Sequence, residues 1–349
     1  MAPKVLLSGE SYPPDTRPFS GRESVLNMHG FVSPLFGLAT APNGDILVAD
    51  AGAGVSTLDG TTDIPLTGIT DMSPIGRNSM WTIRGLTGSP GDSTGQALFR
   101  SSKGTSRMVA NLFQFERENN PDGEQLIDSN PFDVQSAGGN AAVVADAGGN
   151  DLLRVNNRGQ VEVLAIFPKE LVSTQNVKDI IGCADIPENQ RPPVCGIPPE
   201  IPAQPVPTSI AVGPEGDYYV GELKGFPAPL NESNIWRVAP DASWAMCGTA
   251  GEIYCSKVFD GGFTSVIDMA FGPDGYLYVA EFDDKSWFAA ENQAGVGGTI
   301  NKCNVETTSC SEVATGIPLL TAITFGTDGS LWAVKNALVP GMAEVFKVQ

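Results

Sequence analysis

The sequence predicts an all-β fold, a six-bladed β-propeller with four-stranded antiparallel blades. Three observations lead to this prediction. The 349 residues include 40 Gly and 27 Pro but only 17% charged residues, so turns are frequent and long helices are not expected. One strand–turn–strand pattern recurs along the chain. Most copies are followed by a third strand and then a fourth, which is the composition of a propeller blade.

The repeated unit is a short apolar strand, a Pro-x-Gly turn and an alternating strand that ends in an acid. It is clearest at 37–50 (GLATAPNGDILVAD), 209–222 (SIAVGPEGDYYVGE) and 268–281 (DMAFGPDGYLYVAE). Three weaker copies lie at 322–335, which ends in Lys, at 133–146, whose turn is Ala-Gly-Gly-Asn, and at 73–85. Third strands are expected at 152–155, 235–238 and 344–348. Six copies account for residues 1–349 as one domain.

The ring is expected to close through the start of the chain. The sixth blade ends at Gln349 after only three strands, whereas residues 4–8 form an isolated strand. We predict that residues 4–8 pair with residues 344–348, because closure removes the open strand edges that an incomplete ring exposes.

Two stretches do not fit the blades and are predicted to be inserted loops. Residues 85–130 contain a Ser/Gly/Thr-rich segment followed by 108–119, whose apolar spacing allows a short helix. Residues 168–206 are rich in proline. Loops of this length are usually functional lids or disordered links, and a cysteine pair in the second loop argues against disorder there.

The six cysteines form three close pairs, Cys183/Cys195, Cys247/Cys255 and Cys303/Cys310, and no Cys-x-x-Cys spacing occurs. Three local disulfides are the simplest pairing, although fifteen connectivities are formally open and reduced core cysteines are the alternative. Disulfides predict a secreted or periplasmic protein. The chain has no apolar run long enough to span a bilayer, and its first residues lack the apolar stretch of a signal peptide. An exported protein would therefore have lost its signal before this sequence begins.

Charge and histidine content exclude several classes of function. Acidic residues outnumber basic ones by 40 to 21, which gives a formal net charge of −19. Such a field repels phosphate backbones and anionic lipids, so we expect no nucleic acid or membrane partner. The protein is also expected to be a monomer. His29 is the single histidine, which excludes mechanisms that need two. It lies outside every copy of the repeat and is expected to be a surface or packed loop residue.

Two aspartates are the first candidates for a metal site. Aligning the copies places Asp133 and Asp268 at one position of their inner strands, opposite Gly37, Ser209 and Ala322. The small residues leave room at the axis, so both carboxylates are expected to face the channel mouth where the inner strands begin. Ca²⁺ prefers six to eight oxygen ligands, so carbonyls, water or Asn130 would have to complete a site. The alternative is that both aspartates cap backbone amides.

The acids that end the second strands form an apparent ring of weaker metal candidates: Asp50, Asp146, Glu222 and Glu281. Four crowded carboxylates would raise one another's pKa values, so a functional ring implies a cation. The alternative interpretation is that each acid holds the turn to the next strand by accepting amide hydrogen bonds.

Further ligand-binding candidates lie in the two loop regions. Asp128 and Asn130 flank a serine in a DSNP segment, but no base for a serine hydrolase accompanies them. Glu116 on the expected short helix faces either the channel or solvent. Trp287 stands beside a phenylalanine in loop 285–295 and is predicted to wall a ligand site.

Segments 115–134, 143–168, 207–227 and 266–282 closely resemble the ScyD/ScyE family, above all through DSNP and VADAGGNDLLRV. The resemblance covers nearly the whole chain from about residue 31. It departs in a Ser-rich insertion near 88–106, in the 183–206 segment and in the Cys247/Cys255 loop. The resemblance implies an exported NHL-like propeller of the kind encoded with the scytonemin pigment genes of cyanobacteria. It implies no particular reaction.

Together these features predict an exported propeller that binds a small organic ligand or polymer segment at one channel mouth, as a binding or accessory protein. One alternative is a Ca²⁺-dependent hydrolase or lyase that uses the channel-mouth carboxylates. Another is a protein–protein scaffold, which would expose an apolar patch. Whether the protein is an enzyme stays open at this point, since fold alone does not decide it.

Overall fold

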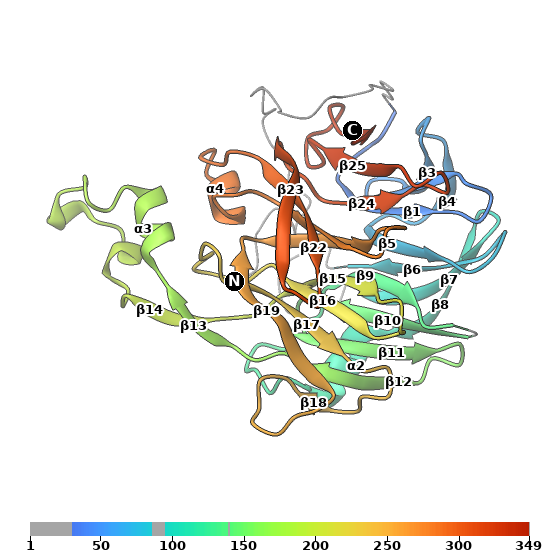
Figure 1. Ribbon diagram of the computed structural model, residues 1–349, viewed down its shortest axis with the longest axis horizontal. Coiled ribbons are helices and arrows are strands. Elements are labelled where there is room, and N and C mark those ends of the chain that lie inside the picture. The colour runs from blue at the N-terminus through green and yellow to red at the C-terminus, as the bar shows by residue number, and fades with distance from the viewer. Residues whose placement is uncertain (1–29, 86–94, 139, 349) are drawn as a thin grey trace.

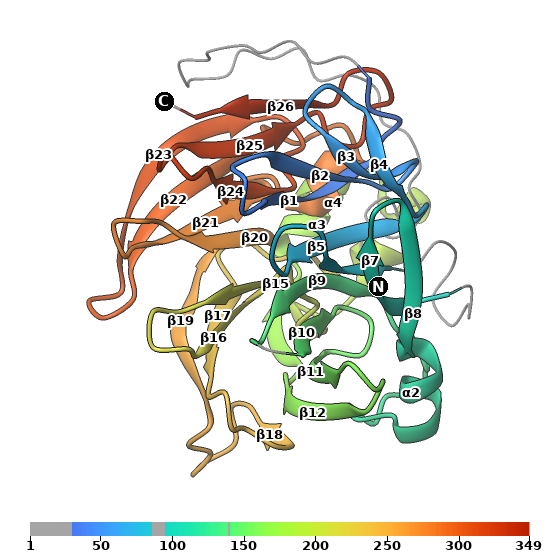
Figure 2. The same cartoon turned by 90° about the vertical axis from the view of Figure 1, so that its right-hand side faces the viewer.

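The computed structural model describes residues 30–85, 95–138 and 140–348 and shows the predicted six-bladed β-propeller (Figure 1). Figure 2 looks along the channel, which the inner strands β1, β5, β9, β15, β20 and β24 encircle. All neighbouring strands within a blade pair antiparallel, and each blade runs outward from its inner strand in chain order.

The first three blades follow one another along the chain. Blade 1 consists of β1 (Leu35–Thr40), β2 (Ile46–Asp50), β3 (Gly54–Thr57) and β4 (Thr62–Pro65). Blade 2 consists of β5 (Ile69–Pro74), β6 (Met80–Arg84), β7 (Ala97–Ser102) and β8 (Thr105–Asn111). Blade 3 consists of β9 (Pro131–Ser136), β10 (Ala141–Asp146), β11 (Asp151–Asn156) and β12 (Val161–Ile166).

The other three blades complete the ring. Blade 4 consists of β15 (Pro207–Val212), β16 (Tyr218–Glu222), β17 (Ser233–Val238) and β19 (Cys255–Phe263). Blade 5 consists of β20 (Val266–Phe271), β21 (Leu277–Glu281), β22 (Gly298–Asn304) and β23 (Ser309–Ile317). In the described residues, blade 6 has three strands, β24 (Ile323–Phe325), β25 (Leu331–Lys335) and β26 (Glu344–Lys347). The predicted closing strand, residues 4–8, lies outside the described residues, so closure stays a prediction.

The prediction that residues 85–130 form one inserted loop is wrong in its middle part. Strands β7 and β8 pair with each other and complete blade 2. The sequence hides β8 because four of its seven side chains are exposed, the apolar Met108 among them, so no apolar alternation marks it. Within the described residues of this range, the segment after β8 is the part that lies outside the blade. The expected short helix is present as α2 (Leu112–Asn119), and Asn111 caps it by accepting a hydrogen bond from the Gln114 amide at 2.8 Å.

Residues 168–206 do form an insertion outside the blades, as predicted. Strands β13 (Glu170–Ser173) and β14 (Glu200–Ala203) pair as a hairpin. Its far end carries α3 (Gln175–Ile181) and two 3₁₀ turns, η1 (Glu188–Gln190) and η2 (Pro193–Gly196). The Cys183–Cys195 disulfide closes this end, and the whole insertion extends away from the blades in Figure 1.

All three predicted disulfides are present, and no cysteine is free. Cys303 and Cys310 lie directly opposite each other on β22 and β23. The Cys247–Cys255 loop follows β18 (Ala245–Met246), which pairs parallel with β12 and so covers the outer edge of blade 3. Three disulfides are typical of an extracellular or periplasmic protein. No helix in the described part of the chain is long and apolar enough to cross a membrane.

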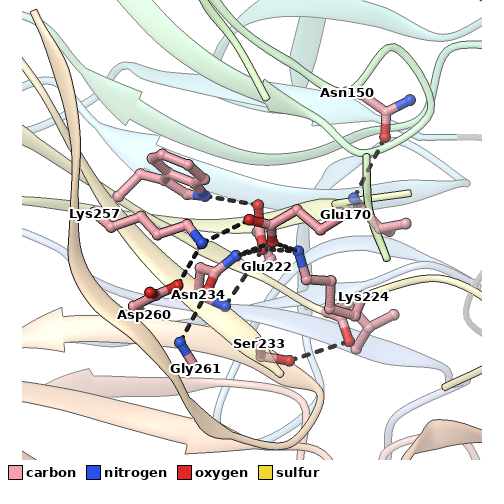
Figure 3. Close-up of polar contacts among 12 residues, drawn as sticks. Asn150, Glu170, Glu222, Lys224, Ser233, Asn234, Lys257, Asp260 and Gly261 are labelled. Carbon is pink, nitrogen blue, oxygen red and sulfur yellow. Dashed lines mark hydrogen bonds and ion pairs between the residues drawn. The ribbon is translucent and has the colours of Figure 1, made fainter. Parts of the chain in front are cut away.

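A buried ion-pair network joins the inserted hairpin to blade 4 (Figure 3). Lys224 Nζ lies 2.7 Å from Glu222 and 2.6 Å from Glu170 of β13, and the Lys224 and Glu222 side chains are fully buried. Lys257 of β19 contacts the other Glu170 oxygen at 2.6 Å. Burial raises the pKa of Glu170, but its lysine partners outweigh that effect and hold the pKa at about 2. The network therefore holds the base of the insertion against the propeller.

Candidate functional site

The channel end at which the inner strands begin is filled by apolar side chains. The rings of Phe36 in blade 1 and Phe132 in blade 3 meet edge to face with centroids 5.7 Å apart, although blade 2 separates their strands. Buried Val206, Ile267 and Leu320 belong to the same cluster. The described residues therefore pack this mouth, at which the sequence predicted a ligand, with core side chains.

Trp287 also belongs to this apolar cluster rather than to a ligand wall. It begins α4 (Trp287–Glu291), is only 3% exposed, and donates its indole N–H to the Lys224 carbonyl at 2.8 Å. The predicted ligand-wall role is wrong because the loop folds into a helix that turns the ring inward. His29 lies outside the described residues.

A cavity of about 350 Å³ lies in the other half of the channel, towards the ends of the inner strands. All six inner strands contribute to its wall. Its acidic lining residues are Asp71, Asp133 and Asp268; polar ones include Thr40, Ser73, Gln135 and Thr324, and the aromatic ones are Phe271 and Phe325. Among the residues that the structure describes, no basic side chain lines the cavity.

The structure brings Asp133 and Asp268 into this cavity and adds Asp71 at the same strand position. Each aspartate accepts the amide N–H of the next inner strand: Asp71 from Val134 at 3.0 Å, Asp133 from Ile210 at 2.5 Å and Asp268 from Ile323 at 2.7 Å. The amide-binding alternative is thus part of their role. Each of the three aspartates thus links its blade to the next one and also lines the cavity.

Asp71 was missed because the second copy was recognised only from residue 73. The signal was the dipeptide Asp71-Met72, which matches Asp268-Met269 at the start of the clearest copy. Gly37 occupies this position in blade 1, and a β-carbon there would collide with the Asp71 carboxyl group. The small residue predicted to leave room at the axis makes space for this third acid.

Burial dominates the protonation of the three channel aspartates. It raises the pKa of Asp71 well above its ordinary value, and the nearby charge and hydrogen bond of Asp133 raise it further. Burial raises the pKa of Asp133 to about 6, although the hydrogen bond to Asp71 opposes the increase. Burial and then repulsion from Asp133 raise the pKa of Asp268. The two neighbouring carboxyl groups therefore differ in proton affinity, and Asp71 holds its proton more tightly than an isolated aspartic acid does.

Each acid of the predicted ring accepts hydrogen bonds from its own set of donors. Asp50 accepts the Val32 amide at 2.7 Å, and Asp146 accepts the Asn130 amide at 2.6 Å. Glu222 accepts the Trp236 indole N–H at 2.6 Å, and Glu281 accepts the Asn301 side-chain amide at 2.6 Å. In residues 30–85, 95–138 and 140–348, no group of three or more His, Cys, Asp or Glu is spaced as a ready metal site. The four acids hold local turns and strands, so a shared ring is not what the structure shows.

Glu116 and Asp128, expected to bind a ligand, lie away from the channel and close to Asp146. Asn130 joins this cluster of acids because its backbone N–H donates a hydrogen bond to Asp146. Burial, followed by repulsion from Asp146, raises the pKa of Glu116 to about 9 and that of Asp128 to about 7. These residues form a second acidic site beside α2.

No protein-family model and no curated protein matches this chain. Among solved structures, the soluble aldose sugar dehydrogenase of Escherichia coli superposes with a TM-score of 0.54 at 15% identity, over 95% of this chain and 99% of that one. A gluconolactonase of Xanthomonas campestris gives 0.52 at 11% identity, over 98% of both chains. Virginiamycin B lyase of Staphylococcus aureus gives 0.47 at 14% identity, over 95% and 89%. The first two likenesses support the propeller fold, and at such identities they show the fold alone.

Proposed function

We propose that this protein is a binding or accessory propeller that holds a small organic ligand in the channel cavity. The main support is a cavity of about 350 Å³ whose described lining residues include Asp71, Asp133 and Asp268 and no basic side chain. Cavities of this size are typical of small-molecule sites. Buried carboxyl groups without a cationic partner favour a ligand that brings a positive charge or hydrogen-bond donors.

The aromatic side chains at the cavity support the same class of ligand. Phe271 and Phe325 line the cavity, and each is held edge to face by a tyrosine, Tyr219 or Tyr278. Aromatic faces attract organic cations and also cover the apolar faces of sugars. An amine, an amino sugar or a polyol therefore fits this chemistry best.

The test is binding by the purified protein to a panel of diamines, amino sugars and polyols, screened by melting temperature and measured by calorimetry. We expect one ligand per chain, and Asp133→Asn should lower affinity for amines about ten- to hundredfold, the value of a hydrogen bond to a charged group. The exposed acid Asp185 supplies the control variant Asp185→Asn, which should bind as the wild type does. A panel without any binder, or unchanged affinity in Asp133→Asn, would contradict the proposal.

A hydrolase or lyase is the second candidate, and the Asp71–Asp133 pair favours it. Two neighbouring carboxyl groups with unequal proton affinities can serve as general acid and general base at one site, and a base with a pKa of about 6 is well matched to near-neutral pH. With a ligand in hand, Asp71→Asn separates the two functions. An enzyme would turn the ligand over in the wild-type form and lose turnover in the variant, whereas a binding protein would show no turnover in either form, even where the variant binds more weakly.

Export and membership of the ScyD/ScyE family belong to the same proposal. The propeller fold and the three disulfides support them. The scaffold alternative would use exposed apolar side chains, and such residues gather around the Cys247–Cys255 loop: Trp244, Met246, Ile253 and Tyr254. The channel cavity favours a small ligand over this loop as the main site.

A further inference from the structure

A second group of carboxylates lies where α2 and the segment after it meet the loop between β10 and β11. Its members come from the insertion after blade 2 and from blade 3: Glu116, Asp122, Asp128, Asp146 and Asp151. They repel one another, since the charges of Asp146, Glu116 and Asp122 all add to the raised pKa of Asp151 after burial. The basic side chain that acts on Asp122, Lys169, is itself paired with Glu124 at 2.5 Å.

Three of these carboxyl groups border one small space beside Gly149. A β-carbon on Gly149 would lie 3.3 Å from Glu116 Oε2, 3.5 Å from Asp151 Oδ1 and 3.5 Å from Asp146 Cγ. The space exists because residue 149 has no side chain. The carboxyl groups that meet beside Gly149 therefore come from three elements: α2, the end of β10 and the start of β11.

The carboxylate of Asp151 is buried without a compensating donor or cation among the described residues. Its side chain is 1% exposed, and neither carboxylate oxygen has a hydrogen-bond partner in the part of the chain that the structure describes. By contrast, Asp146 Oδ1 accepts three backbone amides and its Oδ2 accepts the Ser129 hydroxyl, while Asp122 accepts the Asn150 side-chain amide at 2.8 Å. An unpaired buried carboxylate is strongly unfavourable unless a cation or a proton compensates it.

We propose that the space beside Gly149 binds a divalent cation of the Ca²⁺ type, with Glu116, Asp146 and Asp151 as direct ligands. Ca²⁺–oxygen distances are about 2.3–2.6 Å, and the cation must also stay clear of the Gly149 Cα, so the three carboxyl groups have to move towards one another from the positions they occupy here. Asp122 and Asp128 stand next to them and can complete the shell through water. The larger, irregular shell of Ca²⁺ suits mixed carboxylate ligands better than the strict octahedron of Mg²⁺.

The proposed site also explains how the insertion after blade 2 is held. Glu116 lies on α2, whereas Asp146 and Asp151 end β10 and begin β11. A cation shared by these residues joins the insertion to blade 3, and it replaces repulsion among the acids with attraction. This site is separate from the channel cavity and does not depend on the function proposed for it.

The test uses the full chain stripped with EDTA and then dialysed, with Ca²⁺ alone as the probe. Calorimetry should show one Ca²⁺ per chain, and added Ca²⁺ should raise the melting temperature. Asp151→Asn and Gly149→Ala should each lower Ca²⁺ affinity at least about tenfold. The alanine fits because the Gly149 backbone lies outside the left-handed region and its β-carbon meets no atom closer than 3.3 Å.

Two readouts separate loss of binding from loss of folding. Without Ca²⁺, Asp151→Asn should melt at or above the wild-type temperature, because it removes an unpaired buried charge. Asp185→Asn, an exposed acid on the other insertion, should bind Ca²⁺ as the wild type does. Three results would overturn the proposal: no Ca²⁺ heat and no melting shift up to about 5 mM, unchanged affinity in both site variants, or loss of binding in Asp268→Asn, which would place the cation in the channel.

Discussion

At the scale of the residue, one position of the inner strand determines the chemistry of the channel. Asp71, Asp133 and Asp268 occupy it in blades 2, 3 and 5, and each accepts an amide from the following blade. The same carboxyl groups line the cavity. A single residue type thus joins neighbouring blades and supplies the polar surface that a ligand would meet.

Buried acids also predict how stability depends on pH. The pKa of Glu116 is raised from 4.5 to about 9 and that of Asp128 from 3.8 to about 7. For such groups the folded chain holds protons that the unfolded chain releases. Their stabilisation is complete below pH 4 and is lost as pH rises through the folded-state values. In EDTA, the melting temperature should therefore increase as the pH is lowered from 8.5 to about 5.

Melting curves between pH 5 and pH 8.5 check this prediction, and Glu116→Gln should make the dependence shallower. Glu170, with a folded pKa of about 2, works in the opposite direction only below about pH 4.5, where its ion pairs begin to be lost. A melting temperature that rises steadily from pH 5 to pH 8.5 would contradict the prediction.

At the scale of the element, insertions are held to the blades by charged side chains. The β13–β14 hairpin meets blade 4 through Glu170, Lys224 and Lys257. The segment after β8 meets blade 3 through the acids around Gly149. Neither insertion adds a strand to a blade, and α2 is held by buried Leu112 and Phe113 as well as by its acidic neighbours.

Lys224 is expected to matter more than Glu170 for stability. Lys224→Ala leaves Glu222 buried without its cation and should lower the free energy of unfolding by about 3–5 kcal/mol. Glu170→Ala should cost less, because Lys224 keeps its contact with Glu222. The exposed pair of Lys347 and Asp328 supplies a control, since Lys347→Ala should change stability by about 1 kcal/mol or less.

Chemical denaturation measures these differences, and limited proteolysis between residues 183 and 200 reports on the hairpin. Glu170→Ala should speed cleavage there even where global stability changes little. Equal stability of Lys224→Ala and the wild type would show that the buried ion pair does not hold blade 4.

At the scale of the whole molecule, the ring depends on its closure. In the described residues blade 6 ends at β26, whose outer edge faces the position expected for a fourth strand. Each blade of the ring packs against two neighbours. A missing fourth strand in blade 6 would leave an open strand edge and would therefore weaken the whole ring rather than one blade.

Deletion of residues 1–9 is expected to lower the melting temperature by about 5 °C or more, because residues 4–8 are predicted to complete blade 6. Leu6→Pro should have the same effect, since proline removes a ladder hydrogen bond. Ser11→Pro, outside the predicted strand, serves as the control. Melting curves of the deletion and of Leu6→Pro that match the wild type would remove the predicted closure.

Much of the architecture was readable from the repeats. The Pro-x-Gly turns located three inner hairpins, and weaker copies of the same pattern located the others. The third strands followed at the expected places, and the close cysteine pairs gave all three disulfides. The prediction of blade 2 was incomplete for two reasons. The outer strand β8 carries exposed polar side chains, and the copy of the repeat in blade 2 was recognised from a residue two positions late, which also concealed Asp71. Local patterns detect strands that alternate between core and solvent, and they fail where an outer strand does not.

The sequence by itself determined the propeller, its disulfides and the presence of buried acids on the inner strands. Only the tertiary structure decided which mouth is packed with Phe36 and Phe132 and which holds the cavity. It also decided that Trp287 is core and that Glu116 meets Asp146 and Asp151 around Gly149. The physical reason is that strand and turn preferences act between near neighbours, whereas a cavity or a cluster of charges depends on groups that the closed ring brings together from distant segments.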